Sequence, residues 1–206
     1  MTKSESTLHQ NIEDVRAMLL GLRYFEAQVE AISQLLCDVL RSGHKLLACG
    51  NGGSAADASH LATEFVVRYE RDRRPFPAIS FTTNGGDMTA IGNDYGFEEI
   101  FARQVRAFGQ KGDIFVALTT SGKSENVRRA LMAAKEAGVH TVAFLGRDGG
   151  ACKGLAEIEI IIEHTVTARI QEAHKLLLHT ICEMVEETLY KENKGDSGKE
   201  NRRDPL

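Results

Sequence analysis

Two kinds of hydrophobic pattern follow one another along the chain. From residue 4 to residue 42, apolar residues recur at every third or fourth position, which predicts one or two amphipathic helices. Short apolar runs then predict buried strands at residues 45–49, 78–81, 113–118, 140–145 and 158–162. Helical patterns separate these runs at residues 54–69, 97–108 and 124–137, and a long one follows at 167–191.

This alternation of strands and helices predicts an α/β fold: a doubly wound, five-stranded parallel sheet with helices on both faces. The N-terminal helices precede the sheet, and we expect residues 1–192 to form a single domain. The last stretch, NKGDSGKENRRDPL, is polar and of mixed charge, so residues 193–206 are predicted to be a disordered tail.

The composition narrows the class of protein. Of the 206 residues, 42% are hydrophobic and 26% charged, as in soluble globular proteins, and the net charge of −4 disfavours nucleic-acid binding. The four cysteines are widely spaced without a CxxC pair, so we expect reduced core residues rather than disulfides or a zinc cluster. The first residues, MTKSESTLHQ, contain no apolar segment, and we expect a cytoplasmic protein.

Two loops at the carboxyl ends of predicted strands carry small polar residues. GNGGS, residues 50–54, follows the first strand, and Ser54 is expected to be the N-cap of the next helix. TTSGKS, residues 119–124, follows the third strand and also leads into a helix. Glycines let a ligand approach the backbone, and N–H groups at a helix start attract anions. Either loop alone could be an ordinary turn, but together they favour a phosphorylated ligand or sugar hydroxyls.

A dinucleotide site is the alternative for the first loop. Gly50 and Gly52 follow a strand, as in the dinucleotide-binding fingerprint. The third glycine of that fingerprint is missing, and the second strand ends in SFTT without the acidic residue that would hold a ribose. The pattern therefore disfavours a dinucleotide.

Residues able to ligate a metal or move protons occur in two of the predicted helices. His60 and Glu64 are four positions apart, so they share a helix face, although such pairs are common on exposed helices. In the last helix, Gln171, Lys175 and His179 form one stripe with the same spacing. His174 lies on another face and is expected to be structural or exposed.

In combination, these motifs resemble the sugar isomerase (SIS) domain family and, within it, the bacterial phosphoheptose isomerases. The segments that carry the resemblance occur in family order: GNGGSAADASHLATEF, AIGNDYGFEEIFARQV, TTSGKSENV, LGRDGG and ARIQEAH. The resemblance runs from the first helix to about residue 190. It implies a flavodoxin-like SIS fold, in agreement with the predicted sheet.

The resemblance also implies roles for individual residues. The implied catalytic residues are Glu64 and His179. The implied substrate-binding residues are Asn51, Gly52, Gly53, Ser54, Glu64, Asn93, Asp94, Thr119, Thr120, Ser121, Ser124 and Gln171. In members that bind zinc, the ligands correspond to His60, Glu64, Gln171 and His179, so one Zn2+ per subunit is expected.

The implied reaction is the aldose–ketose isomerisation of D-sedoheptulose 7-phosphate to D-glycero-D-manno-heptose 7-phosphate, the first step of ADP- or GDP-heptose synthesis for lipopolysaccharide and other surface polysaccharides. The family's homotetramers, with active sites at subunit interfaces, imply the same assembly here. Two alternatives remain. One is a SIS isomerase for another sugar, such as arabinose 5-phosphate. The other is a non-catalytic SIS adaptor that binds the replication initiator DnaA, and that adaptor lacks the carboxylate and the late histidine.

Overall fold

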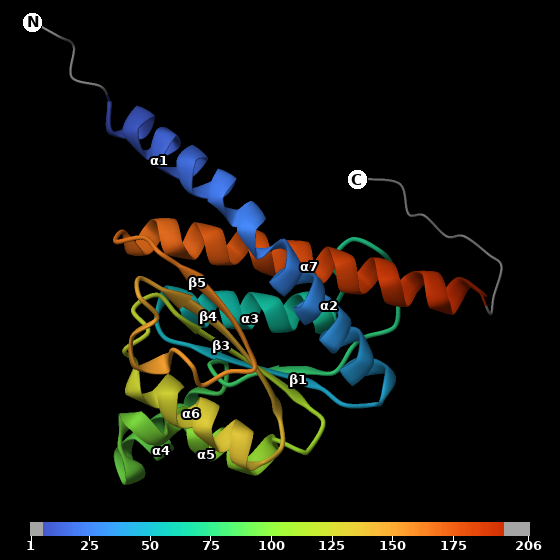
Figure 1. The fold of residues 1–206 in the computed structure, drawn as a ribbon. Helices are drawn as coiled ribbons and strands as arrows, with labels where there is room; N and C mark the ends of the chain where they lie inside the picture. The colour runs from blue at the N-terminus through green and yellow to red at the C-terminus, as the bar shows by residue number, and fades with distance from the viewer. Residues whose placement is uncertain (1–5, 196–206) are drawn as a thin grey trace, which may run out of the picture.

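The chain folds into a parallel sheet between two layers of helices (Figure 1), in a computed structural model that describes residues 6–195, with side chains to residue 192. The strands are β1 (Leu46–Gly50), β2 (Ala78–Ser80), β3 (Ile114–Thr119), β4 (His140–Gly146) and β5 (Ile158–Ile162). The α-helices are α1 (Thr7–Gly21), α2 (Glu26–Arg41), α3 (Gly53–Val66), α4 (Gly85–Tyr95), α5 (Ile100–Phe108), α6 (Glu125–Glu136) and α7 (Thr167–Gly195). Short 3₁₀ helices are η1 (Leu22–Phe25), η2 (Phe97–Glu99) and η3 (Gly150–Cys152).

The sheet has the order β2-β1-β3-β4-β5, and all neighbouring strands are parallel. This is the flavodoxin-like order, in which chain direction across the sheet reverses between β1 and β3. The predicted five-stranded, doubly wound sheet is therefore confirmed. Every predicted strand lies within one residue of the observed one at each end, and β5 matches at both ends.

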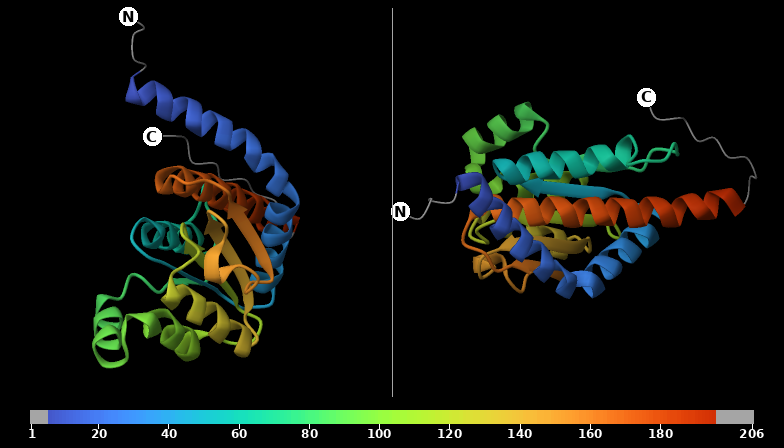
Figure 2. Two further views of the ribbon diagram at one scale, coloured as in Figure 1. Left: turned by 60° about the vertical axis from the view of Figure 1, so that its left-hand side comes forward. Right: turned by 90° about the horizontal axis from the view of Figure 1, so that it is seen from above.

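The side chains of successive residues in each central strand point alternately to the two faces of the sheet. Leu46 and Ala48 of β1 belong to the hydrophobic core under α2, α3 and α7, whereas Leu47 and Cys49 belong to the core under α5 and α6. The left view of Figure 2 shows the helices that cover the two faces, on either side of the sheet. All four cysteines are free and buried, as expected of core residues, and burial raises the pKa of the Cys182 thiol to about 12.

Three helices differ from the prediction, and one of them, α3, ends at Val66 rather than at residue 69. Helix α4 was not predicted, because its sequence GGDMTAIGNDY contains three glycines and little apolar periodicity; the side chain of Asn84 caps its N-terminus. Helix α7 continues to Gly195, three residues into the predicted tail. The rest of that tail, residues 196–206, lies outside the described residues.

Helix α1 extends away from the sheet and its covering helices (Figure 2). None of its residues is buried. It contacts α7, where Arg169 donates a hydrogen bond to the carbonyl oxygen of Asn11 at 2.9 Å, and its Met18 and Leu19 pack against the hydrophobic core. Over the described part of the chain, no helix combines the length and the apolar character needed to cross a membrane.

Candidate active site

The turn after β1 forms a tight glycine corner. Gly52 has a φ of +56°, a left-handed conformation that glycine adopts without strain, and it is the N-cap residue of α3. A Cβ at Gly50 would lie 2.9 Å from Cβ of Ser54, so strand and helix approach closely here. The expectation that Ser54 is the N-cap is wrong: the helix begins earlier, and Ser54 is buried in its first turn.

The turn after β3 gathers hydroxyl groups. Oγ1 of Thr119 lies 3.4 Å from Oγ of Ser121 and 3.2 Å from Oγ of Ser124, and Thr120 lies in the same loop. Ser124 is the N-cap residue of α6, and its side chain makes no capping hydrogen bond. Because β1 and β3 are hydrogen-bonded neighbours, this loop and the glycine corner open at the same edge of the sheet.

Asn51 and Asn126 join the two loops through their side-chain amides. Nδ2 of Asn51 donates to Oδ1 of Asn126 at 2.9 Å, and Nδ2 of Asn126 donates to Oδ1 of Asn51 at 3.0 Å. Asn126 is 2% exposed and also accepts a hydrogen bond from the backbone N–H of Val127. Asn126 was not predicted, and its only local signal is its place in the first turn after a hydroxyl-rich loop. A pocket of about 340 Å³ beside the pair is lined by Asn51, Phe97, Glu98, Ser124, Glu125, Asn126 and Arg129.

Helices α3 and α7 bring together three of the residues predicted to be catalytic or metal-binding. Nε2 of His60 lies 2.6 Å from Oε1 of Glu64 and 3.3 Å from Nε2 of His179, which is 119 residues away in the chain. Burial lowers the pKa of His179, and the neighbouring charges of His60 and Lys175 lower it further. Both effects favour the neutral imidazole of His179, which can accept a proton at one ring nitrogen and donate one from the other.

A buried ion pair fixes the chain just beyond Glu64. The Arg73 guanidinium donates hydrogen bonds to the carbonyl oxygens of Glu64 at 2.7 Å and Phe65 at 3.0 Å, at the C-terminal end of α3. The buried carboxylate of Glu186, on α7, lies 3.5 Å from Nε of Arg73 and accepts backbone N–H groups of residues 69–71. These contacts also hold the ring of Tyr69 against His179, with 5.9 Å between the ring centroids.

The cluster of His60, Glu64 and His179 fits a metal ion by its donor atoms. One ligand atom from each residue lies within 4.8 Å of the other two. Two ligands of a tetrahedral zinc ion at its usual bond lengths are about 3.3 Å apart, and the two imidazole Nε2 atoms are separated by 3.3 Å. The Glu64 oxygen is at hydrogen-bonding distance from His60, so it would move slightly outward as a ligand.

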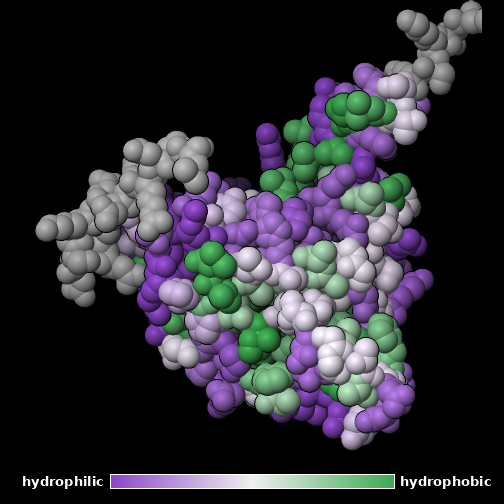
Figure 3. Space-filling model, turned by 180° about the vertical axis from the view of Figure 1, so that it is seen from behind, coloured by the Kyte–Doolittle hydropathy of each residue, from purple (hydrophilic) through white to green (hydrophobic). Residues whose placement is uncertain are grey.

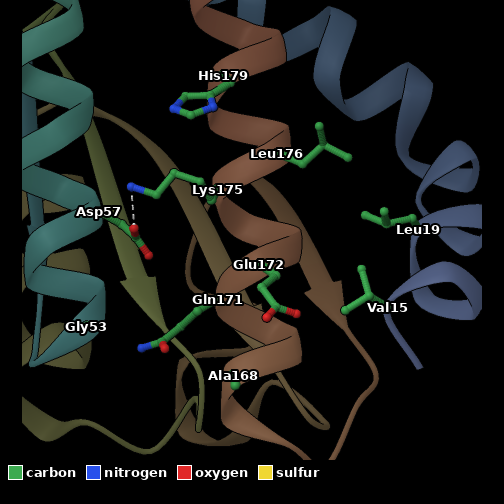
Figure 4. Close-up of a pocket in the computed structure, with 10 residues that line it drawn as sticks. All are labelled: Val15, Leu19, Gly53, Asp57, Ala168, Gln171, Glu172, Lys175, Leu176 and His179. Carbon is green, nitrogen blue, oxygen red and sulfur yellow. Dashed lines mark ion pairs between the residues drawn. The ribbon is translucent and has the colours of Figure 1, made fainter. Parts of the chain in front are cut away.

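The fourth predicted ligand, Gln171, lies elsewhere along α7. It precedes His179 by two helical turns, about 12 Å along the axis, and a Cβ at Gly53 would lie 2.9 Å from its side-chain carbon Cδ. Figure 4 shows Gln171 beside the start of α3 and His179 at the opposite end of a shared pocket. That pocket, of about 550 Å³, is lined by Val15, Leu19, Gly53, Asp57, Ala168, Gln171, Glu172, Lys175, Leu176 and His179. The role of Gln171 as a metal ligand stays a prediction.

Two further predicted residues are exposed. Asn93 and Asp94 lie at the end of α4, where Nδ2 of Asn93 donates to Oδ1 of Asp94 at 2.7 Å, and they line neither pocket described above. Their role in substrate binding stays a prediction. His174, by contrast, is buried against Phe144 with Nε2 at 3.2 Å from the carbonyl oxygen of Leu145, so of the two expected places, structural and exposed, it takes the structural one.

Known proteins resemble this chain in both sequence and structure. The model of the SIS domain family matches residues 11–146. A phosphoheptose isomerase from Clostridium acetobutylicum is 43% identical over 188 residues, which cover 91% of this chain and 95% of that protein. The solved phosphoheptose isomerase structure from Neisseria gonorrhoeae has a TM-score of 0.81 at 37% identity and covers 87% of this chain and 97% of its own. The solved phosphoheptose isomerase structure from Francisella tularensis has a TM-score of 0.84 at 32% identity and covers 87% of this chain and 96% of its own.

Proposed function

We propose that this chain, which belongs to the SIS domain family and within it to the phosphoheptose isomerases, converts D-sedoheptulose 7-phosphate to D-glycero-D-manno-heptose 7-phosphate. One observation carries the proposal beyond the similarity. The carboxylate of Glu64 and the imidazole of His60, both on α3, meet the imidazole of His179 on α7. Helix α3 starts at the glycine corner, which lies beside the hydroxyl-rich loop.

The chemistry follows from the positions of Glu64 and His179. Glu64 takes the proton from C1 of the open-chain ketose, which leaves an enediolate, and returns it to C2 to give the aldose. His179 moves the accompanying proton between the two sugar oxygens, because a neutral imidazole can accept a proton at one nitrogen and donate one from the other. The hydroxyls of Thr119, Ser121 and Ser124 bind the phosphate.

The metal that the family resemblance implies has a place in this scheme. His60, Glu64 and His179 would hold a zinc ion, with Gln171 as the further predicted ligand. A bound zinc supplies a Lewis acid that polarises the sugar carbonyl and stabilises charge on its oxygen. With the metal held there, Glu64 would still serve as the base through its second carboxylate oxygen.

We further propose that the protein is a cytoplasmic homotetramer with active sites at subunit interfaces. Helix α1 carries exposed apolar side chains, including Leu8 and Ile12, which are 69% and 52% exposed, and Figure 3 shows apolar groups on this projecting helix. Val15 and Leu19 of the same helix line the pocket that contains His179. A second subunit packed on α1 would therefore lie beside the catalytic residues.

The non-catalytic adaptor for DnaA is the weaker candidate. Its distinguishing mark in the family is the loss of the catalytic carboxylate and the late histidine. Here Glu64 and His179 are both present and lie on either side of His60 in one cluster.

The test is NMR spectroscopy of D-sedoheptulose 7-phosphate incubated with the purified protein in D2O. We expect the aldose to form and deuterium to enter at the carbon next to the carbonyl. The Glu64→Gln variant should abolish both signals, whereas the matched Glu187→Gln variant, which neutralises an exposed carboxylate on α7, should behave as wild type. Absence of turnover in the wild type with zinc supplied would refute the isomerase and leave the adaptor to be tested by DnaA binding.

A further inference from the structure

Lys175 lies inside the candidate active site, between Gln171 and His179 on α7. Its Nζ atom is 2.7 Å from Oδ1 of Asp57 and 3.2 Å from Nδ1 of His60. Asp57 is buried on α3, one turn before His60. Figure 4 shows the side chain of Lys175 reaching across the pocket to Asp57. The lysine thus connects a buried carboxylate with the imidazole predicted to ligate zinc.

The hydrogen-bonding capacity of Lys175 determines which nitrogen of His60 carries the proton. An ammonium group has donors and no acceptor, so Nδ1 of His60 must accept from Lys175. A neutral imidazole then carries its proton on Nε2, the atom that lies 2.6 Å from Oε1 of Glu64. The network therefore runs in one direction, with Lys175 donating to His60 and His60 donating to Glu64.

Metal binding requires the opposite arrangement of His60. A metal on Nε2 needs the lone pair of that atom, so the proton moves to Nδ1. The N–H at Nδ1 would then face the ammonium of Lys175, whose Nζ lies 3.2 Å from Nδ1, so two hydrogen-bond donors would oppose each other. Histidine ligands normally donate their second N–H to an acceptor such as a carboxylate. Asp57, now paired with Lys175, is a carboxylate that lines the same small pocket as His60.

We infer that Lys175 is a positioning residue that opposes metal binding: it holds His60 as a hydrogen-bond donor to Glu64, and a metal binds only when Lys175 turns away and Asp57 takes its place at Nδ1. The change moves one proton from Nε2 to Nδ1 of His60 and needs no other reactant. This inference rests on the metal site of the proposed function but not on turnover, because zinc affinity is measured without substrate.

The first measurement uses the unaltered protein. In the metal-free protein, ¹⁵N NMR of the histidine side chains should show His60 with its proton on Nε2, and zinc should move that proton to Nδ1. A metal-free His60 with its proton on Nδ1 would overturn the inference without any variant.

The second measurement is the dissociation constant of Zn2+, obtained by competition with a chelator. The Lys175→Met variant keeps the aliphatic length and removes the charge, and it should bind zinc about 10- to 100-fold more tightly than wild type, the usual size of effects from residues around the ligands. Lys175→Arg retains the donors and should bind as wild type does. Lys191→Met, which removes an exposed lysine further along α7, is the matched control and should also leave the affinity unchanged.

Asp57→Asn should change the affinity in the opposite direction, since it removes the charged acceptor that the metal-bound His60 needs. Zinc binding by Lys175→Met that is no tighter than wild type would overturn the inference, as would a failure of both proteins to bind zinc. If circular dichroism shows that Lys175→Met is unfolded, two other measurements decide whether the inference stands: the position of the proton on His60 and the zinc affinity of Asp57→Asn. Altered zinc affinity without isomerase activity would separate this inference from the proposed function.

Discussion

Replacing Gly122 by alanine should lower the free energy of unfolding and disturb the hydroxyl-rich loop that we propose binds the phosphate. Gly122 has a φ of +63° and lies in the hydroxyl-rich loop, packed against the backbone of the turn after β4. A Cβ there would overlap the carbonyl group of Gly149 and lie 2.7 Å from the backbone nitrogen of Gly150. Because these are backbone atoms, no side-chain rotation can relieve the overlap.

The expected loss of stability has two parts. Holding alanine in the left-handed region costs about 1 kcal/mol, and forcing the two loops apart adds about 2–3 kcal/mol, as for other overpacked sites. The Gly154→Ala variant measures the first part alone, because Gly154 has a φ of +82° but no atom lies within 4 Å of its Cβ position. Gly154→Ala should therefore lose only about 1 kcal/mol, whereas Gly122→Ala should lose about 3–4 kcal/mol.

Urea denaturation of both variants and steady-state kinetics test this reasoning. In Gly122→Ala, movement of Thr119, Ser121 and Ser124 should raise KM for the phosphosugar more than it lowers kcat. Gly154→Ala should leave both constants near the wild-type values. Equal stability losses in the two variants, or an unchanged KM in Gly122→Ala, would show that the loops are not held together by close backbone packing.

Three other predictions concern buried polar groups. Asn126→Ala removes both amide hydrogen bonds to Asn51, so we expect a loss of about 1–3 kcal/mol in urea denaturation and a raised KM; an unchanged KM would mean that the pair does not position the loops. Burial lowers the pKa of His174 from 6.5 to about 4, so its contribution to stability is present above pH 6.5 and lost as the pH falls towards 4. That loss is about 3 kcal/mol, and stability measured between pH 7.5 and 4.5 should depend less on pH in His174→Leu than in wild type. Glu186→Gln leaves the buried Arg73 charge without its carboxylate partner and should lower the free energy of unfolding by about 3–5 kcal/mol; a loss below about 1 kcal/mol would show that the burial of Arg73 does not depend on this carboxylate.

Much of this fold is determined by local sequence. The strands were predicted to within one residue because each is a short buried apolar run between turn residues, and such runs depend on neighbouring positions only. The two loops were recognised for the same reason, since glycines and hydroxyl residues mark them directly. Helix α4 was missed because its glycines hide the periodicity and its N-terminal cap, Asn84, lies outside the pattern.

What only the tertiary structure decided is which distant residues meet. The spacing of His60 and Glu64 predicted a shared helix face, but the approach of His179 depends on how α3 packs against α7. The same packing turns Gln171 towards Gly53 and places Lys175 between Asp57 and His60. Periodicity fixes the face of a helix on which a side chain lies, but it does not fix the partner helix or the axial shift between the two. Those are set by the packing of helices distant in sequence over the sheet, and they decide which polar groups are close enough to bond.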